Sequence, residues 1–202
     1  MDKLLPANSA LLLIECQNDF MSEGGAFYPS TQAVIETVNM VEHARAALQA
    51  ARTAGLTVMH APISFSKGYP ELGSDPYGIL GGVVEHNALL RGEWGSQIVE
   101  ELAPVGEDIV IEGKSGLDAF ASSNLDFILR SRKIENLVVG GFLANCCCEG
   151  TMRSAYEGGY TVYALADAMG ASSMEELDNA VKFNFPMFAK VTTADEFVAA
   201  VK

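Results

Sequence analysis

The sequence is short of basic residues, and this shortage narrows the range of partners. It contains 13 Lys and Arg residues against 26 Asp and Glu residues, for a formal net charge of −13 at pH 7. A surface this acidic repels nucleic acid phosphates and anionic lipid heads, so we expect neither as a partner. Dense anionic ligands are disfavoured for the same reason, and a small neutral substrate suits the surface better.

A long apolar run is also missing. The longest run near the start is interrupted by Pro6 and Asn8 and ends at Glu15, whereas a membrane-spanning helix needs about 20 apolar residues. The same run is unlike a secretory signal. No linker, internal repeat or low-complexity tract divides the 202 residues, so we expect a single domain over residues 1–202.

Cysteines are few, and three of the four are adjacent, at Cys146, Cys147 and Cys148. Neighbouring Cα atoms lie about 3.8 Å apart, below the separation of about 4.4 Å at which disulfides usually begin. We therefore expect no disulfide framework, and a cytoplasmic location is the simplest interpretation. Consecutive residues cannot surround one ion tetrahedrally, and a second Cys-x-x-Cys arm is absent, so we expect no metal. We also expect no cofactor.

What the chain does contain is an alternation of apolar runs and helical patterns. Five runs predict buried strands and a sixth is a weaker candidate; they cover residues 10–15, 56–61, 108–113, 136–141, 160–167 and, more weakly, 188–193. Helical spacing from Val34 to Leu48 predicts a helix that stops at Gly55. Capping-box patterns at Ser173 and Thr193 predict two more helix starts. The alternation predicts an α/β domain of three α/β/α layers around a mostly parallel six-stranded sheet.

Two long segments, residues 20–31 and 62–95, interrupt this rhythm. Long loops in compact domains are usually functional or disordered. Their glycine, proline and aromatic content suits lids or subunit contacts, and ordinary surface loops are an equally open interpretation.

Polar residues follow four of the predicted strands. Glu15, His60, Lys114 and the cysteine run each come directly after a strand. Ligands of open parallel sheets bind at the carboxyl ends of the strands, so these side chains are candidates for one site.

Helical spacing separates the three cysteines. If a helix begins with Asn145 as its N-cap, Cys148 shares the buried face and Cys146 a polar face, with Cys147 between them. The helix N-terminus then favours a thiolate at Cys147. Free cysteines commonly fill cores, and we expect that role for Cys146 and Cys148.

Three segments, "LLLIECQNDF", "EGKSGLDAF" and "GGFLANCCCEGT", resemble the signature segments of the isochorismatase-like cysteine hydrolases. That family includes nicotinamidases, N-carbamoylsarcosine amidase, and biuret and ureide amidohydrolases. The resemblance runs in order from about residue 10 to residue 168. It implies an isochorismatase-like, Rossmann-like fold and a homo-oligomer, either a dimer or a tetramer.

The resemblance also implies site residues. The family's acid, lysine and nucleophile fall on Glu15, Lys114 and Cys147. A cis peptide bond is implied before Leu143, whose N–H would form an oxyanion hole with the N–H of Cys147. The implied reaction is hydrolysis of a C–N bond in a small neutral amide or ureide through an acyl-enzyme at Cys147.

Aromatic residues near the signature segments are candidates for the substrate pocket. Phe20, Trp94 and Phe120 are the ones we expect to bind substrate, although such residues are as often plain core.

Two features depart from the family pattern. Glu15 stands where Asp is usual, and its longer side chain must be accommodated to keep the same hydrogen bond to the thiol. The segment after His60 lacks the Asp and His cluster with which nicotinamidases bind a metal, which argues against a metal and against nicotinamide as substrate.

A purely structural Glu15–Lys114 ion pair is possible, and three further alternatives stay open. The first is hydrolysis of a vinyl ether, as in true isochorismatases, where the acid acts without a cysteine. The second is a weakly active relative that binds a ligand or senses oxidants through its thiols. The third is activation of Cys147 by His60 in place of Lys114.

Overall fold

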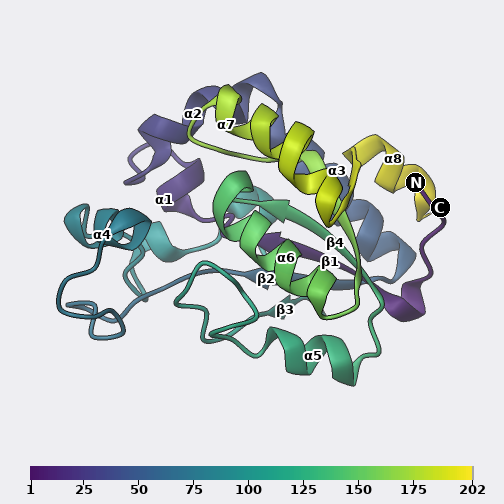
Figure 1. Cartoon of the computed structure of the whole chain (residues 1–202), viewed down its shortest axis with the longest axis horizontal. Helices are drawn as coiled ribbons and strands as arrows, with labels where there is room; N and C mark the ends of the chain where they lie inside the picture. Colours follow the sequence, from purple (N-terminus) through teal and green to yellow (C-terminus); the bar gives the residue numbers. More distant parts are fainter. Residues whose placement is uncertain (202) are drawn as a thin grey trace.

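The computed structural model describes residues 1–201 and is built on one sheet of six parallel strands in the order β3-β2-β1-β4-β5-β6 (Figure 1). The strands are β1 (Ser9–Ile14), β2 (Thr57–Ala61), β3 (Ile109–Val110), β4 (Asn136–Gly141), β5 (Thr161–Met169) and β6 (Lys190–Thr192). Each lies within or overlaps the run that predicts it. The expected six-stranded α/β fold is confirmed, and every strand pairing is parallel.

Helices connect the strands. They are α1 (Asn18–Met21), α2 (Tyr28–Thr37), α3 (Met40–Ala54), α4 (Gly78–Glu85), α5 (Leu125–Ser131), α6 (Glu149–Glu157), α7 (Met174–Asn179) and α8 (Ala194–Ala200). Thr193 caps α8 with a complete capping box, and the Ser173 side chain accepts the N–H of Glu176 at the start of α7. Both predicted helix starts are therefore confirmed.

The single helix predicted between Val34 and Gly55 is wrong, because α2 and α3 are separate. The chain breaks at Asn39, which has a φ of 50°. Asn is one of the few non-glycine residues that tolerate this left-handed conformation. Helical spacing continues across the break, so the apolar pattern alone does not reveal it.

The strands are apolar on both faces because helices cover both. In β1, Leu11 and Leu13 pack with residues of α3 and α8, whereas Leu12 and Ile14 pack with residues of α5 and α6. This alternation is the period of two that side chains have along a strand. Figure 1 shows the resulting three layers, with both chain ends side by side. The N–H of Leu4 donates to the carbonyl of Ala200 there.

The sheet has a switch point between its two central strands. The chain leaves β1 toward β2 and β3 on one side, and β4 toward β5 and β6 on the other. In open parallel sheets this is where ligands bind, at the carboxyl ends of the strands. Gly141, the last residue of β4, has a φ of 118°, and a Cβ there would lie 1.9 Å from the carbonyl oxygen of Ile14. Only glycine allows the two strand ends to approach this closely.

Candidate active site

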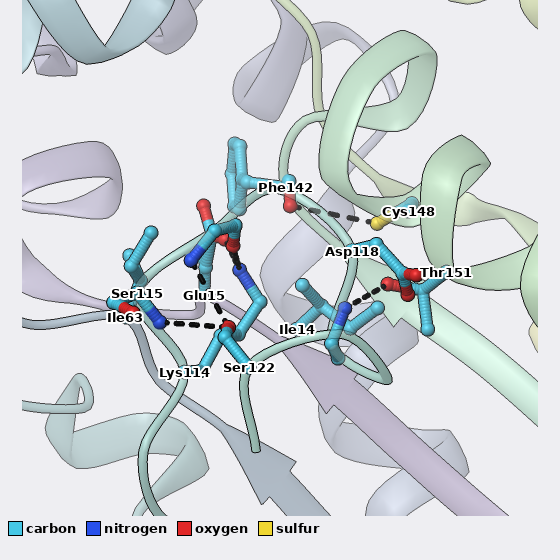
Figure 2. Close-up of polar contacts among 12 residues, drawn as sticks. Ile14, Glu15, Ile63, Lys114, Ser115, Asp118, Ser122, Phe142, Cys148 and Thr151 are labelled. Atoms are coloured by element: carbon cyan, nitrogen blue, oxygen red, sulfur yellow. Dashed lines mark hydrogen bonds and ion pairs between the residues drawn. The ribbon is translucent and has the colours of Figure 1, made fainter. Parts of the chain in front are cut away.

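Glu15 and Lys114 form a buried ion pair at the carboxyl edge of the sheet. Glu15 follows β1 with a φ of 51°, and its carboxylate contacts the Lys114 ammonium (Figure 2). The Lys114 Nζ also donates to the carbonyl of Gly116 at 2.8 Å. A non-glycine residue in left-handed conformation costs about 1–2 kcal/mol, and such strain gathers at functional sites. The backbone turn at Glu15 aims a long acidic side chain at Lys114.

The loop that carries Lys114 is fixed from both sides. The Ser122 hydroxyl accepts the N–H groups of Ser115 and Gly116, each at 3.1 Å. Further along, the N–H of Ala119 donates to the Thr151 hydroxyl of α6 at 3.0 Å (Figure 2). Because α6 continues directly from the cysteine run, this contact couples the loop of Lys114 to the segment of Cys147.

The cysteines lie in a π-helical turn, Ala144–Cys148, that leads into α6. The carbonyl of Leu143 accepts the N–H groups of Cys146 at 3.0 Å and Cys148 at 3.1 Å. The expected N-cap at Asn145 is wrong: Leu143 precedes the first turn and Asn145 is an exposed residue within it. In a π turn each hydrogen bond spans one residue more than in an α turn, and such turns occur frequently at functional sites.

The three thiols have different environments, as their spacing predicts. Cys148 is fully buried, and its Sγ lies 3.6 Å from the carbonyl oxygen of Phe142. Cys146 is half-buried. Cys147 is 2% exposed and lines the same pocket as Glu15. Of the three cysteines, Cys147 is therefore the one whose thiol meets a cavity.

The electrostatics favour a protonated Cys147 in the resting protein. Hydrogen bonding with Cys146, burial and the Glu15 carboxylate together raise its pKa well above the ordinary value, although the Lys114 ammonium opposes them. The hydrogen bond with Cys147 lowers the pKa of Cys146. Burial lowers the pKa of Lys114, but the neighbouring Glu15 carboxylate more than offsets this, so the net shift is upward and Lys114 stays charged. The sequence predicts a thiolate at Cys147, whereas burial and the neighbouring charges favour the protonated thiol.

The peptide bond before Leu143 is trans, because residues 1–201 contain no cis peptide bond. The implied cis bond is therefore wrong for this structure. A non-proline cis bond costs about 2.5–4 kcal/mol, and here the trans backbone is held on both sides. The N–H of Phe142 donates to Ile14 at 2.9 Å, and that of Ala144 donates to Gly170 at 2.7 Å. The N–H of Leu143 itself donates to no backbone or side-chain acceptor within residues 1–201.

A pocket of about 140 Å³ opens above these residues. Its wall consists of Glu15, Phe20, Phe27, Ser30, Thr31, Ile63, Ile79, Leu80, Val83, Leu89, Leu117, Leu143, Cys147 and Ser172. Phe20 lies in the wall as the sequence predicts. The structure does not bring Trp94 or Phe120 there: the Trp94 side chain is exposed, and Phe120 packs against Tyr160 with ring centroids 6.0 Å apart.

Three polar residues after β1 hold the pocket loops in place. The Gln17 amide donates to Ile63 at 2.9 Å and to Ser96 at 2.7 Å. The buried Asp19 carboxylate accepts the N–H of Leu89 at 2.7 Å and that of Ala26 at 3.1 Å. The Asn18 amide donates to the carbonyl of Trp94 at 2.9 Å. Sequence reasoning missed this bracing role, although three consecutive polar residues after a buried strand are a signal for it.

His60 lies away from the thiols. It shares a sheet face with Val58 and Leu13, under α3, and its Nε2 is 3.5 Å from the Asp108 carboxylate. Cys147 packs in the core on the opposite face. Because side chains alternate along a strand, the side chain of His60 in β2 points away from the pocket. The suggested Cys147–His60 pair is therefore wrong.

Residues 1–201 hold neither a ready-made metal site nor a helix that spans a membrane. No group of three or more His, Cys, Asp or Glu side chains is placed to hold a metal ion in this part of the chain. Over the same residues, every helix is too short or too polar to reach across a lipid bilayer.

The fold and the site together define a doubly wound α/β domain with an acid, an amine and a thiol buried at its switch point. Ionisable groups gathered in such a place are typical of enzymes. The isochorismatase domain model matches residues 9–196, and the chain belongs to the isochorismatase family. The family resemblance in the three signature segments is thereby confirmed.

The similarity to known proteins extends over nearly the whole chain. The ureidoacrylate amidohydrolase RutB of Pseudomonas syringae pv. syringae is 31% identical over 207 aligned positions, which cover 96% of this chain and 84% of that protein. The structure of a cysteine hydrolase from Pseudomonas syringae pv. phaseolicola has a TM-score of 0.86 at 25% identity, covering 100% of this chain and 95% of that one. The N-carbamoylsarcosine amidase of Thermoplasma acidophilum has a TM-score of 0.73 at 25% identity, with coverage of 93% and 97%.

Proposed function

We propose that this protein is an amidohydrolase that cleaves a C–N bond of a small amide or ureide through Cys147. The observation that carries the proposal is that the buried Cys147 thiol and the Lys114-paired Glu15 carboxylate line one pocket. The relatives support the reaction class, since they are named as a ureidoacrylate amidohydrolase and an N-carbamoylsarcosine amidase.

The first half of the proposed reaction forms an acyl-enzyme. Glu15 takes the proton of the Cys147 thiol as the sulfur attacks the substrate carbonyl carbon, which places a negative charge on the carbonyl oxygen. The N–H of Leu143, together with the N–H of Cys147, stabilises that oxygen. The C–N bond then breaks, and Glu15 returns the proton to the departing nitrogen, so that ammonia or an amine leaves.

The second half releases the acyl group. Water enters the position that the amine has left, Glu15 accepts one of its protons, and the oxygen attacks the thioester carbon. The C–S bond breaks, the Cys147 sulfur recovers the proton, and the carboxylic or carbamic acid departs. The Lys114 ammonium pairs with the Glu15 carboxylate and holds it in place. A raised pKa of the Cys147 thiol suits this scheme, because the thiol then keeps its proton until Glu15 takes it as the sulfur attacks.

The test is ammonia release from a panel of small amides and ureides by the intact protein and by single cysteine variants. Cys147→Ala should abolish release, since it removes the nucleophile. Cys146→Ala is the matched control, because it removes an adjacent thiol that does not line the pocket, and it should retain turnover. Turnover that survives Cys147→Ala would overturn the proposal, because the C–N bond would then be cleaved without the Cys147 thiol.

A further inference from the structure

Within residues 1–201, the pocket wall contains no cation. Its apolar members are Phe20, Phe27, Ile63, Ile79, Leu80, Val83, Leu89, Leu117 and Leu143, and no Arg, Lys or His of this part of the chain lines it. The nearby Lys114 ammonium already donates hydrogen bonds to the Glu15 carboxylate and to the carbonyl of Gly116. A carboxylate on the substrate would thus enter an apolar space without a counter-ion.

The polar side chains of the wall offer a carboxylate few protons. The Thr31 hydroxyl donates to the carbonyl of Phe20 at 2.5 Å, and the Ser30 hydroxyl donates to that of Phe27 at 2.7 Å. A hydroxyl has one proton, so both present only lone pairs to the pocket. Such oxygens can accept the N–H of an amide or ureide, but they repel an anion. At the rim, the backbone N–H of Ser172 is already taken by the Glu176 carboxylate at 3.1 Å, which leaves the Ser172 hydroxyl as the one wall hydroxyl without an acceptor in residues 1–201.

The apolar wall is braced by stacked rings. Phe20 stacks on Phe27 with centroids 5.2 Å apart and on Phe142 with centroids 5.7 Å apart. A Cβ at Gly170 would lie 2.2 Å from the Phe142 ring, so the stack is also packed from behind. The stacking holds the rings of Phe20 and Phe27 in place, so this part of the wall stays apolar.

From these observations we infer that the site selects uncharged amides or ureides that bear an aliphatic or aromatic group and rejects substrates that bear a carboxylate. The inference rests on the proposed function and specifies its substrate class. The substrate class inferred here also differs from that of the relatives named for ureidoacrylate, a compound with a carboxylate. A buried, unpaired carboxylate costs several kcal/mol, which corresponds to about a hundredfold or more in kcat/KM.

Two isosteric pairs test the inference directly. Isobutylurea and N-carbamoylglycine differ in an isopropyl group against a carboxylate of the same shape, and 3-methylbutanamide and malonamate form a second such pair. We expect kcat/KM for ammonia release to be at least about a hundredfold higher for the neutral member of each pair. Lengthening the aliphatic group by one methylene should raise kcat/KM about fourfold until the pocket is full.

Charge variants show whether the wall causes the preference. Leu80→Arg places a cation in the wall from the half-buried face of α4 and should reduce the preference for the neutral member at least about tenfold. Tyr77→Arg is the matched control: it adds the same charge three residues away, on a side chain that is 91% exposed and outside the pocket wall, and should leave the preference unchanged. Ser30→Arg, at the exposed rim, repeats the test if Leu80→Arg does not fold.

The outcomes separate the inference from the proposed function. If no amide or ureide is hydrolysed, the proposed function fails. If they are hydrolysed but the carboxylated members are turned over as well or better, the inference alone is overturned. The inference is likewise overturned if Tyr77→Arg changes the preference as much as the wall variants do, because the overall charge would then explain it.

Discussion

At the scale of single residues, Glu15 is the most informative position. The family's usual Asp is replaced by a residue one methylene longer, and the backbone at this point adopts a φ of 51°. In that conformation the carboxylate reaches Lys114 directly. The sequence could not show this backbone conformation, because it gives no dihedral angle.

Shortening that side chain should therefore reduce activity. Glu15→Asp withdraws the carboxylate from both Lys114 and the thiol by roughly 1 Å, and we expect kcat/KM to fall about a hundredfold. Glu15→Gln keeps the length of the side chain and removes its basicity, so kcat/KM should fall further. Steady-state kinetics on the best substrate of the panel measure both. A Glu15→Asp variant more active than the natural protein would mean that the glutamate is a handicap.

The thiols should titrate in an order that the sequence did not predict. The pKa of Cys146 is lowered from its ordinary value of 9.0 by the hydrogen bond with Cys147, and the pKa of Cys147 is raised well above that value by the same contact and by burial. Between pH 7 and 9, iodoacetamide should thus label Cys146 faster than Cys147. Peptide mass spectrometry at several pH values measures each rate.

Cys146→Ala is the informative variant for this titration, because it removes the contact that most raises the pKa of Cys147. We expect labelling of Cys147 to become faster and its pH midpoint to move down. A midpoint for Cys147 at or below its ordinary value of 9.0 in the natural protein would contradict the raised pKa.

At the scale of elements, the end of β4 positions the site. Gly141 lets β4 approach β1, and a Cβ there would lie 1.9 Å from the Ile14 carbonyl oxygen. Gly141→Ala should lower the free energy of unfolding by about 3 kcal/mol or more, since backbone must move and a positive φ is strained. Denaturant unfolding measures the change.

Gly159→Ala is the matched control for this substitution. Gly159 has a φ of 89°, but nothing lies within 4 Å of a Cβ added there, so the variant carries the conformational strain without the clash. It should cost only about 1–2 kcal/mol. Equal losses in the two variants would show that the close approach of β1 and β4 contributes nothing beyond the dihedral angle.

The strands and helices also show how much of the fold could be predicted from the sequence. Apolar runs bounded by glycine and polar residues located all six strands, and the capping residues Ser173 and Thr193 located two helix starts. The π turn at Ala144–Cys148 has no sequence signal, because it differs from an α turn only in its hydrogen bonds.

The candidate site residues differ in how far the sequence could predict them. Glu15, Lys114 and Cys147 could be found because a charged residue or a thiol directly follows an apolar strand. Phe27 and Leu80 could not, since their place in the wall depends on how the long loops fold back.

At the scale of the whole molecule, the charge of −13 should act on every small anion that approaches. Alkylation tests this without assuming any enzyme activity. The rate of iodoacetate, an anion, with Cys146 should rise about threefold or more between 0.01 and 0.3 M salt as screening increases. The rate of neutral iodoacetamide should stay constant. Equal salt dependence of the two reagents would show that the net charge does not influence access to the site.

The mass of the protein during turnover shows whether Cys147 carries the acyl group. The protein is mixed with a hydrolysed amide, quenched in acid within milliseconds to seconds, and mapped by peptide mass spectrometry. We expect a mass increase equal to the acyl group on Cys147, absent from Cys147→Ala and retained in Cys146→Ala. Product formation with no adduct on any cysteine, or an adduct on Cys146 or Cys148 alone, would contradict catalysis through the Cys147 thiol.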